Sequence, residues 1–104
     1  MPFANFSCAN LESINFSNLN LSGINLSRSN LSTANLSGTN LSGADLSGAN
    51  LNGAILDNTN LSNANLSNAN FNGVDLRTVI INSETILSPK WRLVWEIFQK
   101  YQSQ

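Results

Sequence analysis

The side chains that could carry out chemistry are few and scattered in this chain. It has no histidine, which excludes a Ser-His-Asp or Cys-His catalytic arrangement and a typical zinc site. The single cysteine, Cys8, has no basic neighbour in sequence, so we expect a free, incidental thiol rather than a nucleophile. The acidic residues are widely spaced: Glu12, Asp45, Asp57, Asp75, Glu84 and Glu96. We therefore expect no enzyme activity, no metal site and no cofactor.

Length and composition favour one small domain. The chain has 104 residues and a net charge of −1, and one cysteine cannot form a disulfide within it. It has neither a signal peptide nor an apolar run long enough to span a membrane. Repeated Asn-x-Ser sequons would attract glycans in a eukaryotic secretory pathway. We therefore expect a cytoplasmic protein.

A large apolar residue recurs at every fifth position over most of the chain. A period of five fits neither the 3.6 of a helix nor the 2 of a flat strand, so it predicts a repeat architecture. The chain should turn a corner every five residues and wind round a filled interior. We call these positions the centres; they are Phe6, Leu11, Phe16, Leu21, Leu26, Leu31, Leu36, Leu41, Leu46, Leu51, Leu56, Leu61, Leu66, Phe71, Leu76 and Ile81.

The other positions of each five also have fixed characters. The small position, two residues before the centre, is mostly Ala, Ser, Thr or an aliphatic residue. The amide position, directly before the centre, is Asn or Asp except at Ile55 and Ile80. The corner position, two residues after the centre, holds all the glycines, whose freedom at positive φ suits a turn. This constant phase argues against a disordered low-complexity chain.

The repeated unit Ala-Asn-Leu-Ser-Gly resembles the consensus of the pentapeptide-repeat family, Ala-(Asp/Asn)-Leu-x-x, from about Ala4 to Ile81. The resemblance implies an all-β solenoid: a right-handed quadrilateral parallel β-helix of about four coils, with twenty residues per coil. The segment Lys90–Ile97 is similar to one found in cyanobacterial members. We expect a β-helix over residues 1–87, and a C-terminal amphipathic helix and tail over residues 88–104. The centres should form four ladders, beginning at Phe6, Leu11, Phe16 and Leu21.

Bulky residues gather near the two ends of the repeat region. They occupy small positions and three of the centres: Ile14, Leu19, Ile24, Val74, Val79, Phe6, Phe16 and Phe71. Because terminal coils of a solenoid must close its core, we interpret them as plugs rather than as ligand-binding residues. Before the first centre, Phe3 is placed to fold over the first coil. This end is one candidate contact surface.

The second candidate contact surface is the C-terminal segment. After Ile81 the period ends, and residues 84–87 are expected to be a lead-out. Ser88 as N-cap and Pro89 as first residue predict a helix over 89–101. Such a short helix is not stable alone, so it should cap the last coil, contact a partner, or do both. The residues expected to make these contacts are Trp91, Val94, Trp95, Phe98 and Tyr101.

Three non-enzymatic functions remain. The resemblance implies a DNA-mimic modulator of DNA gyrase or topoisomerase as one possibility, but residues 1–88 carry a net charge of only −3. Duplex DNA would carry about 11 charges over four coils of ~4.8 Å. Ice binding needs threonine-type ladders, whereas the exposed ladders here are serine. We therefore favour a protein-interaction or scaffold module with an unidentified protein partner or a homodimer, and no nucleic-acid or membrane partner.

Overall fold

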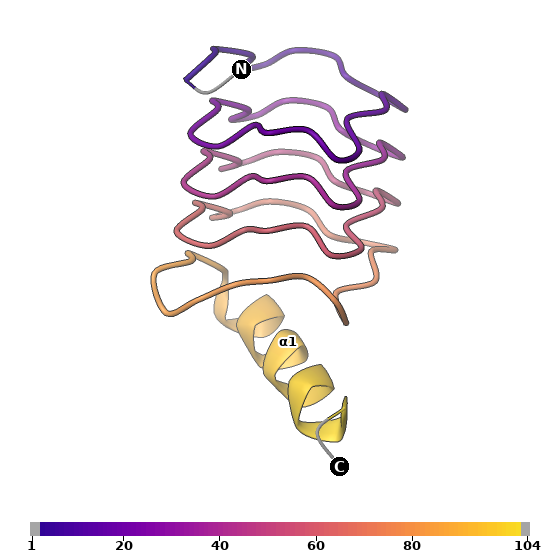
Figure 1. The fold of residues 1–104 in the computed structure, drawn as a ribbon, viewed down its shortest axis with the longest axis vertical. Helices are drawn as coiled ribbons and strands as arrows, with labels where there is room; N and C mark the ends of the chain where they lie inside the picture. The colour runs from indigo at the N-terminus through magenta and orange to yellow at the C-terminus, as the bar shows by residue number, and fades with distance from the viewer. Residues whose placement is uncertain (1–2, 103–104) are drawn as a thin grey trace.

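The computed structural model describes residues 3–102, which form a rod of stacked coils followed by one helix (Figure 1). The helix, α1, spans Pro89–Gln102. The molecule measures 39 × 24 × 24 Å, with the first coil and α1 at opposite ends of the long axis (Figure 1).

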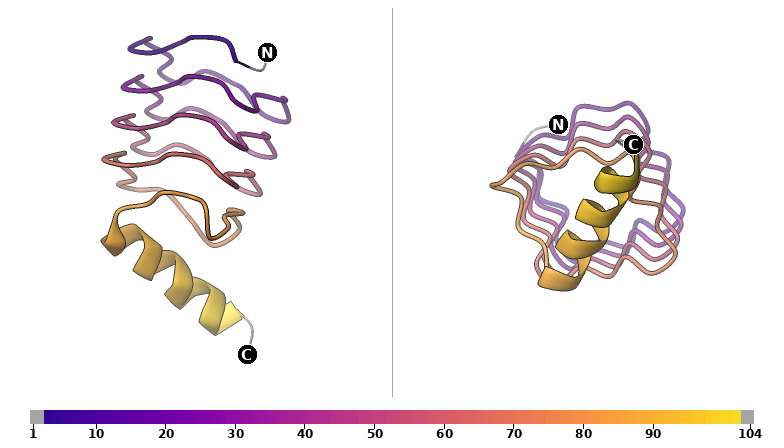
Figure 2. Two further views of the ribbon diagram at one scale, coloured as in Figure 1. Left: turned by 90° about the vertical axis from the view of Figure 1, so that its left-hand side faces the viewer. Right: turned by 90° about the horizontal axis from the view of Figure 1, so that it is seen from below.

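Parallel bridges join residues twenty positions apart, as in Asn5 with Asn25 and Asn25 with Asp45. A coil therefore takes twenty residues, and the stacked coils form a parallel β-helix (Figure 2). We expected strands, but the described residues form isolated bridges only. The reason is that each five contributes a single bridged residue before a two-residue turn follows it.

The amide position pairs with the preceding coil through both of its backbone groups. The N–H of Asn30 donates to the Ala9 carbonyl at 2.9 Å, and the Asn30 carbonyl accepts the N–H of Leu11 at 2.7 Å. From Cys8 to Gly53, the N–H of each corner residue adds a third backbone bond between coils, as from Cys8 to the Ser27 carbonyl at 2.9 Å. Repeated along the rod, these bonds satisfy backbone groups that the turns leave unpaired.

The side chain at the amide position explains the preference for Asn and Asp. Its Oδ1 accepts the backbone N–H two residues later, at 3.1 Å from Ser32 to Asn30 and at 3.0 Å from Ser47 to Asp45. This local bond is an Asx turn, which holds the chain in the corner. The Asn and Asp pattern is visible in the sequence, but this role in the turn was not predicted from it. An isoleucine, as in Ile55, has no side-chain acceptor with which to form this bond.

The interior is filled by the centres and the small positions. All centres are buried except Phe6, Leu11 and Ile81, which are partly buried and belong to the first and last coils. Three small positions are polar and buried, and their hydroxyl groups donate to backbone carbonyls: Ser29 to Leu26 at 2.8 Å, Thr39 to Phe16 at 2.6 Å and Thr59 to Leu36 at 2.7 Å. Each buried hydroxyl group therefore has a partner inside the coil.

The N-terminal end is more open than the sequence predicts. Phe3 does not fold over the interior: it is 85% exposed, and its ring lies beside Gly23 of the next coil. Phe3 occupies a corner position with a φ of 66°, and side chains at corners lie along the outside of the rod. Leu19, expected to be a plug, is 42% exposed, whereas Ile24 is fully buried. Met1 and Pro2 lie outside the described residues.

The predicted lead-out at residues 84–87 is wrong, because the coil continues through it. Ile86 bridges Asn65, and its N–H donates to the Ala64 carbonyl at 2.9 Å, as at any amide position. Thr85 is buried like a small position, and its hydroxyl group donates to the Leu61 carbonyl at 2.8 Å. One extra residue in the preceding turn shifts this pairing from twenty positions to twenty-one. A search for a strict period of five therefore does not detect the unit that contains Thr85 and Ile86.

We predict that Leu41→Asn destabilises the rod by about 2–5 kcal/mol, because it removes a buried apolar side chain and leaves an unpaired amide. The matched change one residue later, Ser42→Asn, lies on the partly exposed wall and should alter the free energy of unfolding by less than about 0.5 kcal/mol. Chemical denaturation followed by circular dichroism measures both. Equal effects at the two positions would contradict the assigned phase.

Candidate protein-interaction site

Helix α1 begins directly after the last side of the β-helix. The Ser88 carbonyl accepts the N–H groups of Trp91 and Arg92, both at 3.1 Å, which places Ser88 at the N-cap. Pro89 follows as the first helical residue, where the missing N–H carries no cost. The start of the helix is therefore fixed at the edge of the last coil.

The inner face of α1 packs against the β-helix core. Trp91, Val94, Trp95 and Phe98 are partly buried against it. The ring of Trp91 meets that of Phe71 edge to face, with centroids 5.5 Å apart and an interplanar angle of 66°. These four residues of the expected contact set are thus partly buried against the core of the β-helix.

Polar side chains of α1 bind carbonyl groups of the last coil. Trp95 Nε1 donates to the Val79 carbonyl at 3.2 Å. Arg92 donates to the carbonyls of Thr85 and Asn82, the second at 3.4 Å. In earlier coils the carbonyl at a small position accepts a bond from the following coil, as Thr59 does from Ile80 at 2.9 Å. At Val79 and Thr85 the carbonyl instead accepts a hydrogen bond from a side chain of α1.

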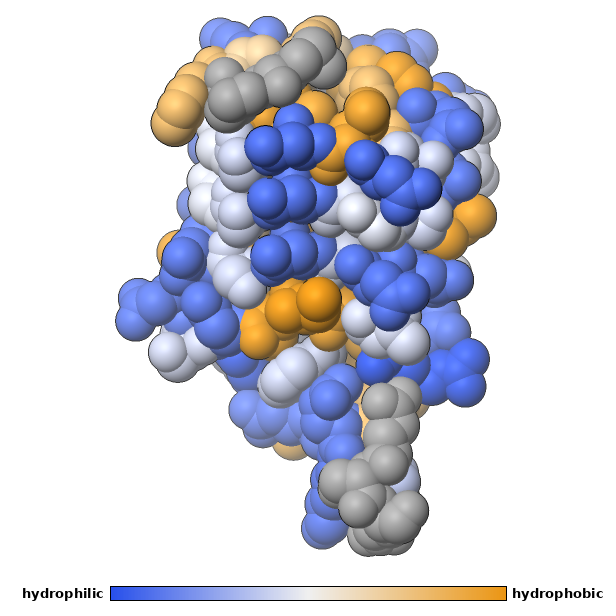
Figure 3. Space-filling model, in the orientation of Figure 1, coloured by the Kyte–Doolittle hydropathy of each residue, from blue (hydrophilic) through white to orange (hydrophobic). Residues whose placement is uncertain are grey.

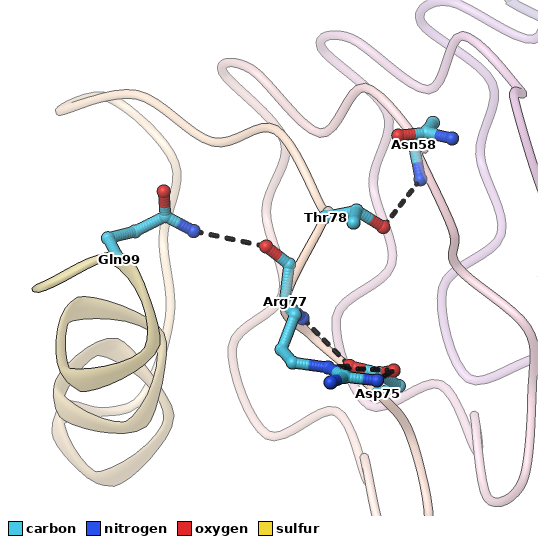
Figure 4. Close-up of polar contacts among 5 residues, drawn as sticks. All are labelled: Asn58, Asp75, Arg77, Thr78 and Gln99. Atoms are coloured by element: carbon cyan, nitrogen blue, oxygen red, sulfur yellow. Dashed lines mark hydrogen bonds and ion pairs between the residues drawn. The ribbon is translucent and has the colours of Figure 1, made fainter. Parts of the chain in front are cut away.

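A further contact between helix and coil lies beside an exposed ion pair (Figure 4). Gln99 Nε2 donates to the Arg77 carbonyl at 3.2 Å, and Arg77 Nη2 lies 2.7 Å from Asp75 Oδ2. The hydrogen bonds from the Arg77 side chain and backbone hold the pKa of Asp75 below its usual value. Because both side chains are largely exposed, this pair contributes little to stability.

The outer face of α1 remains apolar and exposed. Leu93, Ile97 and Tyr101 are 58%, 44% and 67% exposed, and their spacing of four places them along one stripe of the helix. Ile80 and Ile86 of the last coil are about half exposed as well. We call these five residues the C-terminal apolar set. They make up five of the eight exposed large hydrophobic residues among residues 3–102.

The expected contact residues therefore divide between two roles. Of that set only Tyr101 is exposed, while Leu93 and Ile97 were absent from it. The missing signal was the spacing of four between Leu93, Ile97 and Tyr101, which places them along one line of the helix. The sequence of an apolar helix does not show which of its apolar residues the coil covers.

The rest of the described surface offers polar groups without a catalytic arrangement. Cys8 is a free, exposed cysteine at a corner. Residues 3–102 contain no cluster of three or more His, Cys, Asp or Glu side chains suited to a metal ion. Over the same range no helix has the length and apolar character needed to cross a membrane. A polar groove on the wall is lined by Ser27, Arg28, Asp45, Ser47, Gly48 and Asn68.

The sequence model of the family "pentapeptide repeats (8 copies)" matches residues 4–43 and again residues 44–82. The chain belongs to the pentapeptide-repeat family. It accordingly has the right-handed β-helix fold of that family, with α1 as the single helix within residues 3–102. No protein of curated function matches the chain.

Solved structures of pentapeptide-repeat proteins resemble this one. Rfr23 from the cyanobacterium Cyanothece 51142 is 35% identical with a TM-score of 0.50, over 85% of this chain and 63% of its own. A protein from the Arabidopsis thaliana thylakoid lumen is 28% identical with a TM-score of 0.53, over 89% of this chain and 71% of its own. QnrB1, a plasmid-mediated fluoroquinolone resistance protein, has a TM-score of 0.70 at 24% identity, over 88% of this chain and 43% of its own. This chain thus spans less than two thirds of Rfr23 and of QnrB1.

Two substitutions on α1 separate its inner face from its outer face. Trp91→Ala should lower the free energy of unfolding by about 2 kcal/mol or more, because it removes the contact with Phe71. Leu93→Ala, on the exposed stripe, should change it by less than about 0.5 kcal/mol. Denaturation followed by far-ultraviolet circular dichroism compares the two. If Trp91→Ala were as harmless as Leu93→Ala, the packing of α1 described above would be wrong.

Proposed function

We propose that this pentapeptide-repeat protein is a non-enzymatic interaction module that binds a protein partner through the C-terminal apolar set. The observation that carries the proposal is the stripe of Leu93, Ile97 and Tyr101, exposed on a helix whose other face is already packed. Large apolar side chains gathered at one end of a molecule are typical of protein-binding surfaces. Aromatic and aliphatic anchors of this kind supply most of the energy of such interfaces.

The β-helix holds this surface in place. We propose that each coil has four sides, one for each five-residue unit, and that α1 caps the last coil. The bonds from Arg92, Trp95 and Gln99 to coil carbonyls support this arrangement. A partner would then meet a helix fixed on a stiff rod, so little conformational entropy would be lost on binding. The unpaired cysteine and the repeated sequons favour a cytoplasmic setting for this contact.

A DNA-mimic modulator of gyrase is the alternative that we considered. The likeness to QnrB1, at 24% identity, concerns the fold alone. The wall of the rod carries mostly Asn and Ser, and one of its acidic residues, Asp75, is paired with Arg77. Duplex DNA carries about one charge per 1.7 Å, a density that this wall does not approach. The charge pattern therefore favours the protein-interaction module.

The double substitution Leu93→Lys with Ile97→Lys tests the proposed surface. It should lower affinity for the partner on the order of a hundredfold or more, because two apolar anchors become charged. Folding should remain intact, since both side chains are exposed. The assay recovers proteins bound from the native cytoplasm to the wild-type chain and to each variant, used as baits.

Ile55→Lys is the matched control, because Ile55 is 45% exposed but lies on the side wall. The proposal expects the same partner with the wild type and with this control, and its loss with the double variant. Recovery of the same partner at the same level with all three baits would refute a role for the α1 stripe.

A further inference from the structure

The two ends of the rod differ in whether another part of the chain covers the terminal coil. At one end α1 covers the last coil and binds its carbonyl groups. At the other end, no described residue lies on the outer side of the first coil, residues 3–22, and Figure 3 shows hydrophobic surface gathered there. We propose that this first coil is the contact surface for a second copy of the chain, stacked head to head. This site is separate from the one under Proposed function.

Apolar positions of the first coil are open to solvent, since no coil among the described residues covers them. Leu19 is 42% exposed, whereas Thr39 and Thr59, which follow it in the same ladder, are fully buried. Phe6 and Leu11 are only partly buried, while Leu26 and Leu31 directly behind them are fully buried. The apolar side chains left open on the first coil thus occupy the same positions as those that a neighbouring coil covers elsewhere in the rod.

The backbone of the first coil indicates which kind of partner fits. In the second coil, the N–H and the carbonyl of Asn30 both bond to the first coil. The equivalent groups of Asn10 and Asn15 point away from the rod and have no partner among the described residues. Each of these two residues therefore presents one donor and one acceptor side by side. A partner helix cannot pair with such an edge, because its backbone groups bond within the helix. The open edge of another coil can form these hydrogen bonds.

Head-to-head stacking supplies matching geometry. When a second copy is turned over to face the first, its chain runs in the opposite direction along every side. Two residues that each present an N–H and a carbonyl can then exchange both bonds, as in the hydrogen-bonded pairs of an antiparallel sheet. A two-fold axis makes the same surface complementary to itself. Head-to-tail stacking would instead place α1 against the open edge and leave these backbone groups unpaired.

Charge and area are both compatible with self-association. Glu12 is the one charged side chain of residues 3–22, and all four amide positions of this coil are neutral asparagines. Like-charge repulsion between two such ends is therefore small. The end is about 24 Å by 24 Å across. Two copies would bury on the order of 1,200 Å² in total, which reaches the lower range of stable specific interfaces.

The test begins with the full wild-type chain in sedimentation equilibrium over a range of concentrations. We expect a monomer–dimer equilibrium in which the mass stops at two copies. Amide hydrogen exchange, measured at the same concentrations, should slow at Asn10 and Asn15 as the dimer forms. The amides of Asn30 and Asn35 already bond within the chain, so their exchange should stay constant and serve as the internal control.

Variants then locate the contact. Leu19→Lys should raise the dissociation constant of the dimer at least about tenfold, because it introduces a pair of like charges across the two-fold axis. Ile55→Lys, a similarly exposed position on the wall, should leave the dimer intact. A chain that stays monomeric, a mass that grows without limit, or a dimer lost with Leu93→Lys but not with Leu19→Lys would each overturn the proposal. The exchange measurement on the wild type needs no variant to fold.

Discussion

The structure depends on one constraint: every coil must pair its backbone with the coil before it and the coil after it. Each five-residue unit contains a two-residue turn, so only one residue per unit, such as Asn30, carries the bridge. The local Asx turn then brings the chain round the corner for the next side. A buried leucine and a small residue fill the space that these corners enclose. Backbone pairing, turn chemistry and core packing thus all impose the same period of five, and this agreement makes the fold stable.

The same constraint makes the two ends the places where interactions with other molecules should arise. A coil inside the rod has neighbours on both sides, whereas a terminal coil leaves backbone groups and apolar side chains without partners. At the C-terminal end, Trp91 of α1 packs against Phe71, and side chains of α1 donate to the carbonyls of Val79 and Thr85. The outer face of α1 then carries an exposed apolar stripe. At the N-terminal end the edge itself remains, with Leu19 exposed.

The fold was predictable from sequence because each physical requirement recurs once in every five residues. The twenty-residue coil came from family resemblance, and the bridges are consistent with it. Three features were not predictable by counting. One inserted residue near Asn82 hid the side that contains Thr85 and Ile86. The direction of the Phe3 side chain depends on the positive φ of its corner. The edge of α1 that stays exposed depends on how the helix docks, which its own sequence does not specify.

The most direct test of this account compares two duplications inside the rod. Repeating residues 31–50 adds twenty residues, one whole coil, so every ladder continues and α1 still meets the same side of the last coil. Repeating residues 31–48 adds eighteen, which shifts the units beyond the junction by two residues relative to the preceding coil and so places apolar positions outside. Thermal unfolding should show a cooperative transition at an equal or higher midpoint for the first chain, since each added coil brings its own interfaces. The second chain should melt lower and less cooperatively. Equal loss of stability in both chains would contradict the twenty-residue coil as the unit on which this structure is built.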